Sequence, residues 1–202
     1  MLPMLALLLL SVPMLAPSTL SVDPKASSIR FRVDHSLHGV EGESKEIDGK
    51  AVAKDDGKVI ALVRAPLASF HSGDSNRDAH MLEVLEAERF PMVVFRGVAT
   101  AGPESAEPGA PVEMRGEIEL HGRKTLVSVP IKVEPQSDGT VRARAAFDVS
   151  LDAHQVERPS LLFIKIADTC RIEVDLVLRR SKGDQMTTDA PRPVRAGEEL
   201  VQ

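Results

Sequence analysis

The chain has 202 residues, of which 27% are charged and 43% hydrophobic, and its formal net charge is -5 at pH 7. This composition is typical of one globular domain and excludes a disordered, collagen-like or multi-span membrane chain. The acidic balance excludes the broad basic surface that nucleic-acid binding requires, and a single cysteine, Cys170, excludes an intramolecular disulfide and a paired-cysteine zinc or redox motif.

The first twenty residues form an uncharged apolar leader. Its centre, Leu5 to Leu10, is a short hydrophobic run with prolines on both sides. A membrane-spanning helix needs about 20 unbroken apolar residues, so the run fits the hydrophobic region of a secretory signal, with small residues for cleavage at 15–19. We therefore predict a signal peptide over residues 1–20 and a periplasmic or secreted mature protein. An uncleaved apolar anchor is the alternative.

Alternation of apolar and polar residues predicts β-strands along most of the remaining chain. From Ser28 to Asp34, Ile29, Phe31 and Val33 share one face and charged residues take the other, which is the pattern of a half-buried strand. The same pattern predicts strands at 50–53, 58–64, 92–100, 113–121, 124–134, 141–151, 161–166 and 170–178. Tight turns are expected at 55–57, 121–123 and 137–139. Short strands joined by turns indicate an all-β fold, either an antiparallel sandwich or a closed barrel.

Pro130 is irregular within the strand predicted over 124–134. Val127, Val129, Ile131 and Val133 share one face of this strand. Proline has no backbone N–H to donate to a neighbouring strand, so we expect an edge, a bulge or an outward position at Pro130.

One helix is predicted between the strands, after Ser72-Gly73-Asp74 and before Pro91. Its apolar stripe contains Met81, Leu82, Val84 and Leu85. Asp74, Ser75 or Asn76 provides the N-cap, and Pro91 ends the helix by Phe90. We expect the stripe to pack against the barrel or its mouth. Two segments, 102–111 and the tail 181–202, are predicted to be unstructured because they are rich in proline, glycine and charge.

The helix and its flanks resemble a known family. The segment Ser75–Leu82, which reads SNRDAHML, followed by Phe90-Pro91 and the strand through Phe95, resembles the YceI-like family of lipid and polyisoprenoid binders. Weaker motifs follow in the family's order: Ile29-x-Phe31-x-Val33-x-His35, Val40-x-Gly42 and Arg115 to Gly122. The resemblance covers residues 21–180. It implies a lipocalin-like, extended, antiparallel eight-stranded β-barrel with one short helix, exported in many members, that holds an apolar chain inside.

The residues themselves also favour an internal cavity. An eight-stranded barrel is either filled by its own side chains or holds one small ligand, depending on the size of the inward residues. Many are small here, although the alternative is a barrel that its larger Ile, Leu and Phe residues fill. The predicted lining residues are Phe31, Val33, Phe95, Ile118, Val127, Val129, Ala143, Ala145, Phe147, Ile172 and Val174.

Polar candidates for a site are few. Six histidines, His35 and His38 among them, form no compact metal-binding motif, so we predict surface or hydrogen-bonding roles and no metal site. Arg77 and His80 lie at the start of the predicted helix, where they could contact a polar or phosphate head group at the barrel mouth. A structural role, in which Arg77 pairs with Asp78 or a buried carboxylate, is the favoured alternative.

No catalytic constellation is present in the sequence. It lacks a G-x-S-x-G motif and a glycine-rich phosphate loop, and Cys170 falls on the apolar face of its strand. We therefore predict a protein without enzymatic activity or a cofactor, which carries or stores an apolar chain such as a polyisoprenoid, a quinone tail or a fatty acyl amide. We expect no nucleic-acid partner and no membrane span once the signal is removed. The alternatives are a ligand-free periplasmic stress or assembly protein and a quinone- or haem-linked electron-transfer accessory.

Overall fold

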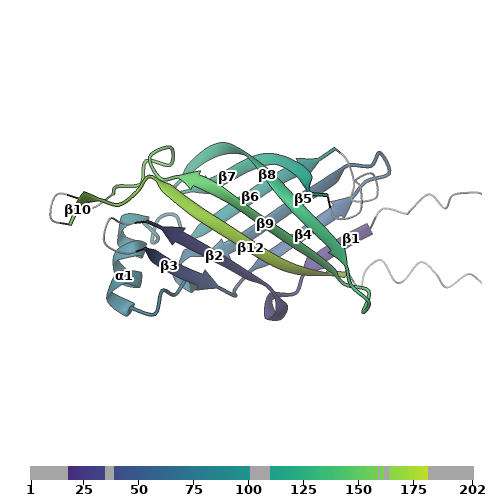
Figure 1. The fold of residues 1–202 in the computed structure, drawn as a ribbon, viewed down its shortest axis with the longest axis horizontal. Coiled ribbons are helices and arrows are strands. Elements are labelled where there is room, and N and C mark those ends of the chain that lie inside the picture. Colours follow the sequence, from purple (N-terminus) through teal and green to yellow (C-terminus); the bar gives the residue numbers. More distant parts are fainter. Residues whose placement is uncertain (1–17, 35–38, 101–109, 159, 162–163, 182–202) are drawn as a thin grey trace, which may run out of the picture.

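A computed structural model describes residues 18–34, 39–100, 110–158, 160–161 and 164–181 (Figure 1). The strands of the main sheet are β1 (Ser18–Val22), β2 (Ser28–Val33), β3 (Val40–Ser44), β4 (Asp48–Ala53), β5 (Val59–Pro66), β6 (Met92–Ala99), β7 (Val112–Leu120), β8 (Arg123–Pro135), β9 (Val141–Ser150) and β12 (Thr169–Arg180). A separate hairpin contains β10 (Ser160–Leu161) and β11 (Ile164–Lys165). The helical elements are the short 3-10 helices η1 (Pro24–Ala26) and η2 (Leu67–Ser69) and the helix α1 (Ser75–Val84).

The main sheet closes into an antiparallel barrel. Its strand order is β1-β4-β5-β6-β7-β8-β9-β12-β2-β3, and β1 also pairs with β12. β1 and β2 occupy successive parts of the same edge of β12 and are separated by η1. β4 pairs with β1, and β3 pairs with β2. In the barrel wall, β1 and β2 together act as one interrupted strand, and so do β3 and β4. The ten strands of the sheet therefore form an eight-stranded barrel, and the predicted architecture is confirmed.

The end of β3 is held by the segment that follows η2. Glu43 and His71 form an isolated antiparallel bridge, in which each backbone N–H donates to the other's carbonyl oxygen at 3.0 Å. The bridge continues the ring of strands at the end of the barrel where β3 and α1 lie, opposite the end where β1 begins (Figure 1).

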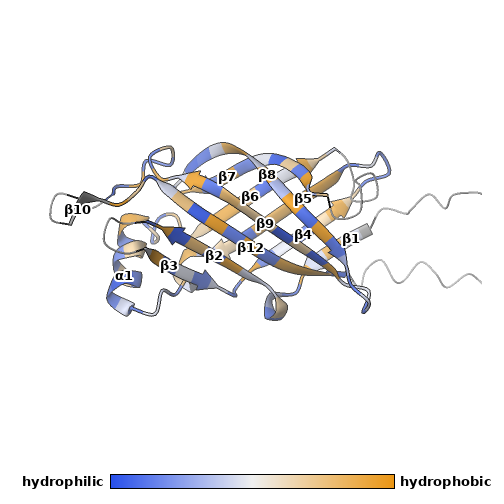
Figure 2. Cartoon of the chain, in the orientation of Figure 1, coloured by the Kyte–Doolittle hydropathy of each residue, from blue (hydrophilic) through white to orange (hydrophobic). Residues whose placement is uncertain are grey.

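Alternation places apolar side chains inside the barrel and charged ones outside. Along β12, Cys170, Leu176 and Leu178 are buried, whereas Arg171 and Glu173 are exposed. Figure 2 shows the same alternation as stripes of hydrophobic and hydrophilic residues across the strands. Outward charges pair across neighbouring strands: both guanidinium nitrogens of Arg142 that face β12 bind Asp175, at 2.7 and 2.5 Å.

Most of the predicted strands and turns are confirmed, with three differences. β3 was not predicted because its sequence, VEGES, has no apolar alternation. Its inward residues are Ser44, which is buried and hydrogen-bonded to the Ser69 hydroxyl at 2.6 Å, and Gly42, which leaves room for the ring of Phe31. β1 begins inside the predicted leader. The single strand predicted over 161–166 is instead the β10–β11 hairpin. Residues 1–17, His35, His38, 101–109 and 182–202 lie outside the described residues.

The barrel wall divides between β8 and β9 at Pro130. All of β8 up to Ile131 pairs with β7, but β9 pairs with β8 only from Ile131 to Pro135. The β7–β8 hairpin has a two-residue turn at His121 and Gly122, both with positive φ, so Leu120 and Arg123 form its first hydrogen-bonded pair. Hydrogen-bonded and non-hydrogen-bonded pairs alternate along an antiparallel ladder, so every second residue from Arg123 directs its backbone nitrogen toward β7. Pro130 belongs to the other set, and its nitrogen faces β9 with no hydrogen to donate. The predicted edge character of Pro130 is confirmed.

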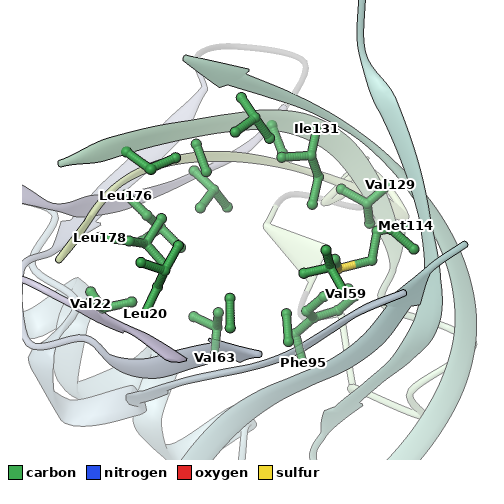
Figure 3. A pocket seen from close by; sticks show the side chains of 18 of the residues that line it. Leu20, Val22, Val59, Val63, Phe95, Met114, Val129, Ile131, Leu176 and Leu178 are labelled. Atoms are coloured by element: carbon green, nitrogen blue, oxygen red, sulfur yellow. The ribbon is translucent and has the colours of Figure 1, made fainter. Parts of the chain in front are cut away.

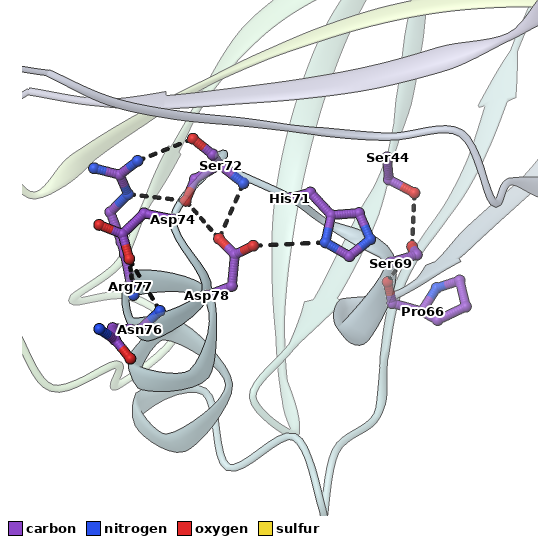
Figure 4. Close-up of polar contacts among 9 residues, drawn as sticks. All are labelled: Ser44, Pro66, Ser69, His71, Ser72, Asp74, Asn76, Arg77 and Asp78. Carbon is purple, nitrogen blue, oxygen red and sulfur yellow. Dashed lines mark hydrogen bonds and ion pairs between the residues drawn. The ribbon is translucent and has the colours of Figure 1, made fainter.

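The helix α1 begins at the N-cap Asp74, whose carboxylate accepts hydrogen bonds from the backbone N–H groups of Asn76 and Arg77 at 2.9 and 3.1 Å (Figure 4). Ser72 lies beside this first turn. Its hydroxyl accepts a hydrogen bond from Arg77 Nε at 2.8 Å and donates one to Asp78. The Asp78 carboxylate also accepts a hydrogen bond from the backbone N–H of Ser72 at 2.9 Å, and it lies 3.5 Å from His71 Nδ1. The side chains of the predicted helix start therefore fasten α1 to the preceding loop.

The helix ends earlier than the position of Pro91 suggests. α1 stops at Val84, and the following residues form turns in which Glu86 has a positive φ of 45°. Met81 packs against the buried cluster that contains Ile29, Ile47 and Phe70, which places the helix on the barrel as predicted. No helix among the described residues is both long and apolar enough to span a membrane.

The division at Pro130 predicts an alternating pattern of amide hydrogen exchange along β8. The N–H groups of Leu126 and Ser128 face the side without a partner strand, so they exchange at least about tenfold faster than those of Val127 and Val129, which face β7. The matched control is Lys132, which has the same orientation as Leu126 and Ser128 but is paired with β9. Slow exchange at all these residues would contradict the division of the wall.

Asp78 predicts a pH-dependent contribution to stability. The hydrogen bonds from Ser72 hold the pKa of Asp78 below its ordinary value despite partial burial. The ionised carboxylate thus stabilises the fold above the unfolded pKa of about 3.9, and this contribution is lost as pH falls through the lower native pKa. Asp78→Asn should reduce the free energy of unfolding by about 1 kcal/mol at pH 7, with the difference narrowing below about pH 4 in urea titrations.

The control for this variant is Asp55→Asn, at an exposed position in the β4–β5 turn, which we expect to leave stability unchanged at both pH values. A deficit in Asp78→Asn that stays constant with pH would show that lost side-chain packing, and not the carboxylate charge, explains its effect.

Candidate ligand-binding site

The barrel encloses an apolar cavity of about 1240 Å³ (Figure 3). Small-molecule sites usually measure about 300–1,000 Å³, so the space suits a ligand of at least drug size. Leu20, Val63, Phe95, Ile131 and Leu176 show how the lining side chains point inward from opposite walls. The barrel is therefore not filled by its own side chains.

The small size of the inward residues explains the cavity. Among the described residues, its lining contains eight alanines but only three phenylalanines, Phe70, Phe95 and Phe147. A barrel of eight strands closes its interior when large side chains occupy successive layers, and alanine at so many lining positions leaves that volume empty. Gly97 and Gly116 face each other across β6 and β7, and a Cβ on Gly97 would lie 2.6 Å from the ring of Phe95. The glycine lets Phe95 lie flat against the wall.

One end of the barrel is filled by a buried cluster. Val33, Ile118, Val149 and Cys170 form its centre, and partly buried apolar residues, Val127 among them, pack around it. This cluster forms the floor of the cavity, because Ile118, Val149 and Cys170 also belong to the cavity lining.

Two histidines fasten the filled end. His154 is fully buried; its Nδ1 donates to the carbonyl oxygen of Ser150 at 2.9 Å, so its Nε2 accepts from the Thr125 hydroxyl at 3.0 Å. His121 Nδ1 donates to the carbonyl oxygen of His154 at 3.0 Å, and its Nε2 lies 3.2 Å from Glu86. These contacts join the β7–β8 turn to the segments that follow β9 and α1. They give both histidines the hydrogen-bonding roles that the sequence predicts.

The other end of the cavity reaches the surface. Its lining there includes exposed residues of the β4–β5 turn, such as Lys54 and Lys58, and residues of the β8–β9 turn, such as Gln136. Arg180 stands at the same rim, in register with Leu20. Arg180 lies on the same inward face of β12 as Leu176 and Leu178. It forms no ion pair with any residue in the described part of the chain. We call this end the mouth.

The structure places eight of the eleven predicted lining residues on the cavity wall. These are Phe95, Ile118, Val129, Ala143, Ala145, Phe147, Ile172 and Val174. The other three, Phe31, Val33 and Val127, also face inward but pack within or against the buried clusters near the filled end. Alternation identifies the inner face of a strand but not the level along the barrel at which side chains cease to fill it.

The structure does not bring Arg77 and His80 to the cavity. Both lie on α1 at the end opposite the mouth; Arg77 binds Ser72, and His80 lies 3.5 Å from Glu83. The structural alternative for Arg77 therefore describes its observed contacts, with Ser72 as the bridge to Asp78. The charged residues of the cavity lining are instead Lys50, Lys54, Asp55, Lys58, Arg64, Glu134 and Arg180. Sequence analysis assigned none of them to the site; Lys54, Asp55, Lys58 and Arg180 stand at the mouth. Strand alternation could have identified Arg180, because it lies two residues beyond Leu178 and therefore on the same inward face of β12.

Cys170 has an environment that suppresses its reactivity. It lies in the floor of the cavity, where burial raises the pKa of its thiol to about 12, and the nearby Asp148 carboxylate adds to the effect. The thiol is therefore protonated at neutral pH and is a poor nucleophile. Among the described side chains, no three His, Cys, Asp or Glu residues gather in a way that could hold a metal ion.

Solved structures with the same fold include proteins from three bacteria. BcnA of Burkholderia cenocepacia is 20% identical with a TM-score of 0.65, covering 77% of this chain and 98% of its own. A polyisoprenoid-binding domain of Saccharophagus degradans, implicated in plant cell wall breakdown, is 15% identical with a TM-score of 0.64, covering 80% and 98%. The YceI protein of Campylobacter jejuni is 13% identical with a TM-score of 0.54, covering 71% and 85%. These identities support a shared fold alone.

A comparison with curated proteins found no match. The family model of the YceI-like domain, in contrast, matches residues 20–178, which run from β1 to the end of the inward apolar face of β12. The closed barrel, the helix α1 and this match across most of the sequence agree, and the chain belongs to the YceI-like domain family.

Proposed function

We propose that this protein binds a long, slender apolar molecule inside the barrel, without covalent chemistry, and carries or stores it in water. The single observation that carries the proposal is the apolar cavity of about 1240 Å³ that opens at one end. The polyisoprenoid-binding domain from Saccharophagus degradans has the same fold, which supports a polyisoprenoid as the ligand class. A quinone tail or a fatty acyl amide has the same slender apolar shape.

The physical basis of binding is burial of hydrocarbon. Each CH₂ group moved from water into an apolar site contributes about 0.8 kcal/mol, so affinity rises with the length of chain that the cavity holds. Alanine and valine walls offer few directional contacts, and a cavity of this kind selects by length and width more than by functional group. The polar end of such a ligand would remain at the mouth, beside Lys54, Lys58 and Arg180.

We further propose that the protein is exported and acts in the periplasm or outside the cell. The uncharged apolar leader supports this location. β1 constrains the processing, because Leu20 and Val22 line the cavity and pair with the ends of β4 and β12. Cleavage must therefore leave Ser18 and the residues after it in the mature chain.

Mass spectrometry of the intact protein from an envelope fraction tests this constraint. We expect a mature N-terminus at or before Ser18. A mature chain that begins after Leu20 would lack most of β1 and would contradict the proposed processing.

The cavity proposal predicts that a large side chain pointing inward blocks uptake, whereas the same side chain pointing outward does not. Ala145 lines the cavity, and its neighbour Ala146 is exposed on the outer face of β9. Ala145→Phe should weaken binding of geranylgeraniol carrying a fluorescent anthraniloyl group by about tenfold or more, because a ring that displaces about two CH₂ groups of the ligand removes about 0.8 kcal/mol for each. Ala146→Phe should bind like the unaltered protein.

Circular dichroism and thermal unfolding check that both variants keep the barrel. Equal binding by the two variants would count against an internal site. Native mass spectrometry of the protein purified from its source, followed by solvent extraction, then identifies the bound molecule; a chain that is empty and also takes up no added isoprenoid would overturn the proposed function.

A further inference from the structure

We propose that the outer face of β4, β5 and β6 beside the mouth docks on an anionic lipid bilayer. The role of this docking in loading the cavity rests on the proposed function, whereas the docking itself does not.

The docking face is a cluster of apolar side chains on the outside of the barrel. Val52, Ile60 and Val98 are in register across β4, β5 and β6, and Leu62 lies next to them on β5. Ile60, Leu62 and Val98 have exposed fractions of 42%, 39% and 39%. We call these four residues the β4–β6 patch. They point outward because the intervening residues of β4 and β5, such as Ala51 and Ala61, line the cavity.

The patch differs from the rest of the outer wall. The corresponding outward positions of β9 and β12 carry charged residues such as Arg144, Asp148 and Glu173. An antiparallel sheet with one face in water normally keeps that face polar, and single exposed apolar residues need no explanation. Apolar residues in register on three adjacent strands form a contiguous surface, which is the feature of interaction sites.

The patch lies next to the mouth. Val52 is two residues from Lys54, and Ile60 is two residues from Lys58; both lysines border the cavity entrance. Two residues of a strand span about 7 Å, so a surface that covers the patch also lies against the rim of the mouth. A water-insoluble ligand could then pass between that surface and the cavity without crossing bulk water.

The charges around the patch indicate the chemistry of its partner. Lys50 lies directly across from Leu62, and Lys54 stands at the adjacent turn. Within the described ranges, neither lysine forms an ion pair, nor does Arg180 at the rim. Lys58 is bound by Asp56 at 2.7 Å, and Asp55 is the one carboxylate of this turn that forms no ion pair with a described residue. The unpaired cations outnumber it, so the rim favours an anionic surface.

These charges also favour a bilayer over a second copy of the chain. A two-fold contact through the patch would gather Lys50 and Lys54 of both copies into one interface, where Asp55 of each copy is the one unpaired carboxylate of the β4–β5 turn to balance them. A bilayer with anionic head groups instead matches the lysines and accepts the apolar side chains at its interface.

Vesicle sedimentation of the full chain tests the proposal. We expect binding to vesicles of phosphatidylcholine and phosphatidylglycerol, weaker binding to phosphatidylcholine alone, and a decrease with added salt. Ile60→Ser combined with Val98→Ser should weaken binding to the anionic vesicles at least about fivefold, and Lys50→Gln combined with Lys54→Gln should do the same. Leu126→Ser is the matched control, because Leu126 is 90% exposed on β8, outside the patch.

Uptake of the fluorescent isoprenoid from cyclodextrin separates docking from the proposed function. The patch variants should keep uptake from cyclodextrin and lose uptake from anionic vesicles. Binding to vesicles that the patch and lysine variants leave unchanged, or that Leu126→Ser weakens equally, would overturn the proposal. A concentration-dependent dimer in size-exclusion chromatography that Ile60→Ser with Val98→Ser abolishes would assign the patch to a second copy and would also overturn it.

Discussion

The closure of the barrel along β12 is the constraint on which the rest of the structure depends. One edge of β12 pairs with β9, and the other is shared by β1 near Leu178 to Arg180 and by β2 from Cys170 to Asp175. A closed ring satisfies the backbone groups that an open sheet would leave at its edges. It also fixes which residues face inward, and without it the alanines of the wall would line no cavity. The cavity and its mouth both depend on this ring.

The barrel has two unlike ends because its inward side chains differ in size along its length. Near the turns of β4–β5 and β8–β9, alanines and valines leave the interior empty. At the opposite end, Val33, Ile118 and Val149 pack together, and His154 joins the backbone beside Ser150 to Thr125. The arrangement gives a container that is open at one end, with a packed floor and a rim at which Lys54 and Arg180 form no ion pair with any described residue.

The sequence predicted which face of each strand points into the barrel more reliably than where along the barrel axis each inward residue lies. Alternation and the turn residues were sufficient to predict most strands. The helix cap at Asp74 and the break in pairing at Pro130 were also predictable, because a capping side chain and a missing N–H are properties of a single residue. β3 was not predictable from hydropathy because tertiary contacts, such as Phe31 over Gly42, stabilise a polar strand. The placement of Arg77 and His80 away from the mouth depends on which end the large side chains fill, which no single strand specifies.

The division at Pro130 shows how an empty cavity and a stable barrel coexist. From Ile131 to Pro135, around the open half of the cavity, β8 and β9 are joined by backbone pairing, which holds the wall without support from interior side chains. Beyond Pro130 this pairing ends, and there the interior is packed and His154 bridges between the segments. Backbone hydrogen bonds thus hold the hollow half, whereas side-chain packing holds the half without complete pairing. A ligand in the mouth half therefore fills volume that the fold does not need for its own stability, and binding to the folded state alone stabilises it further.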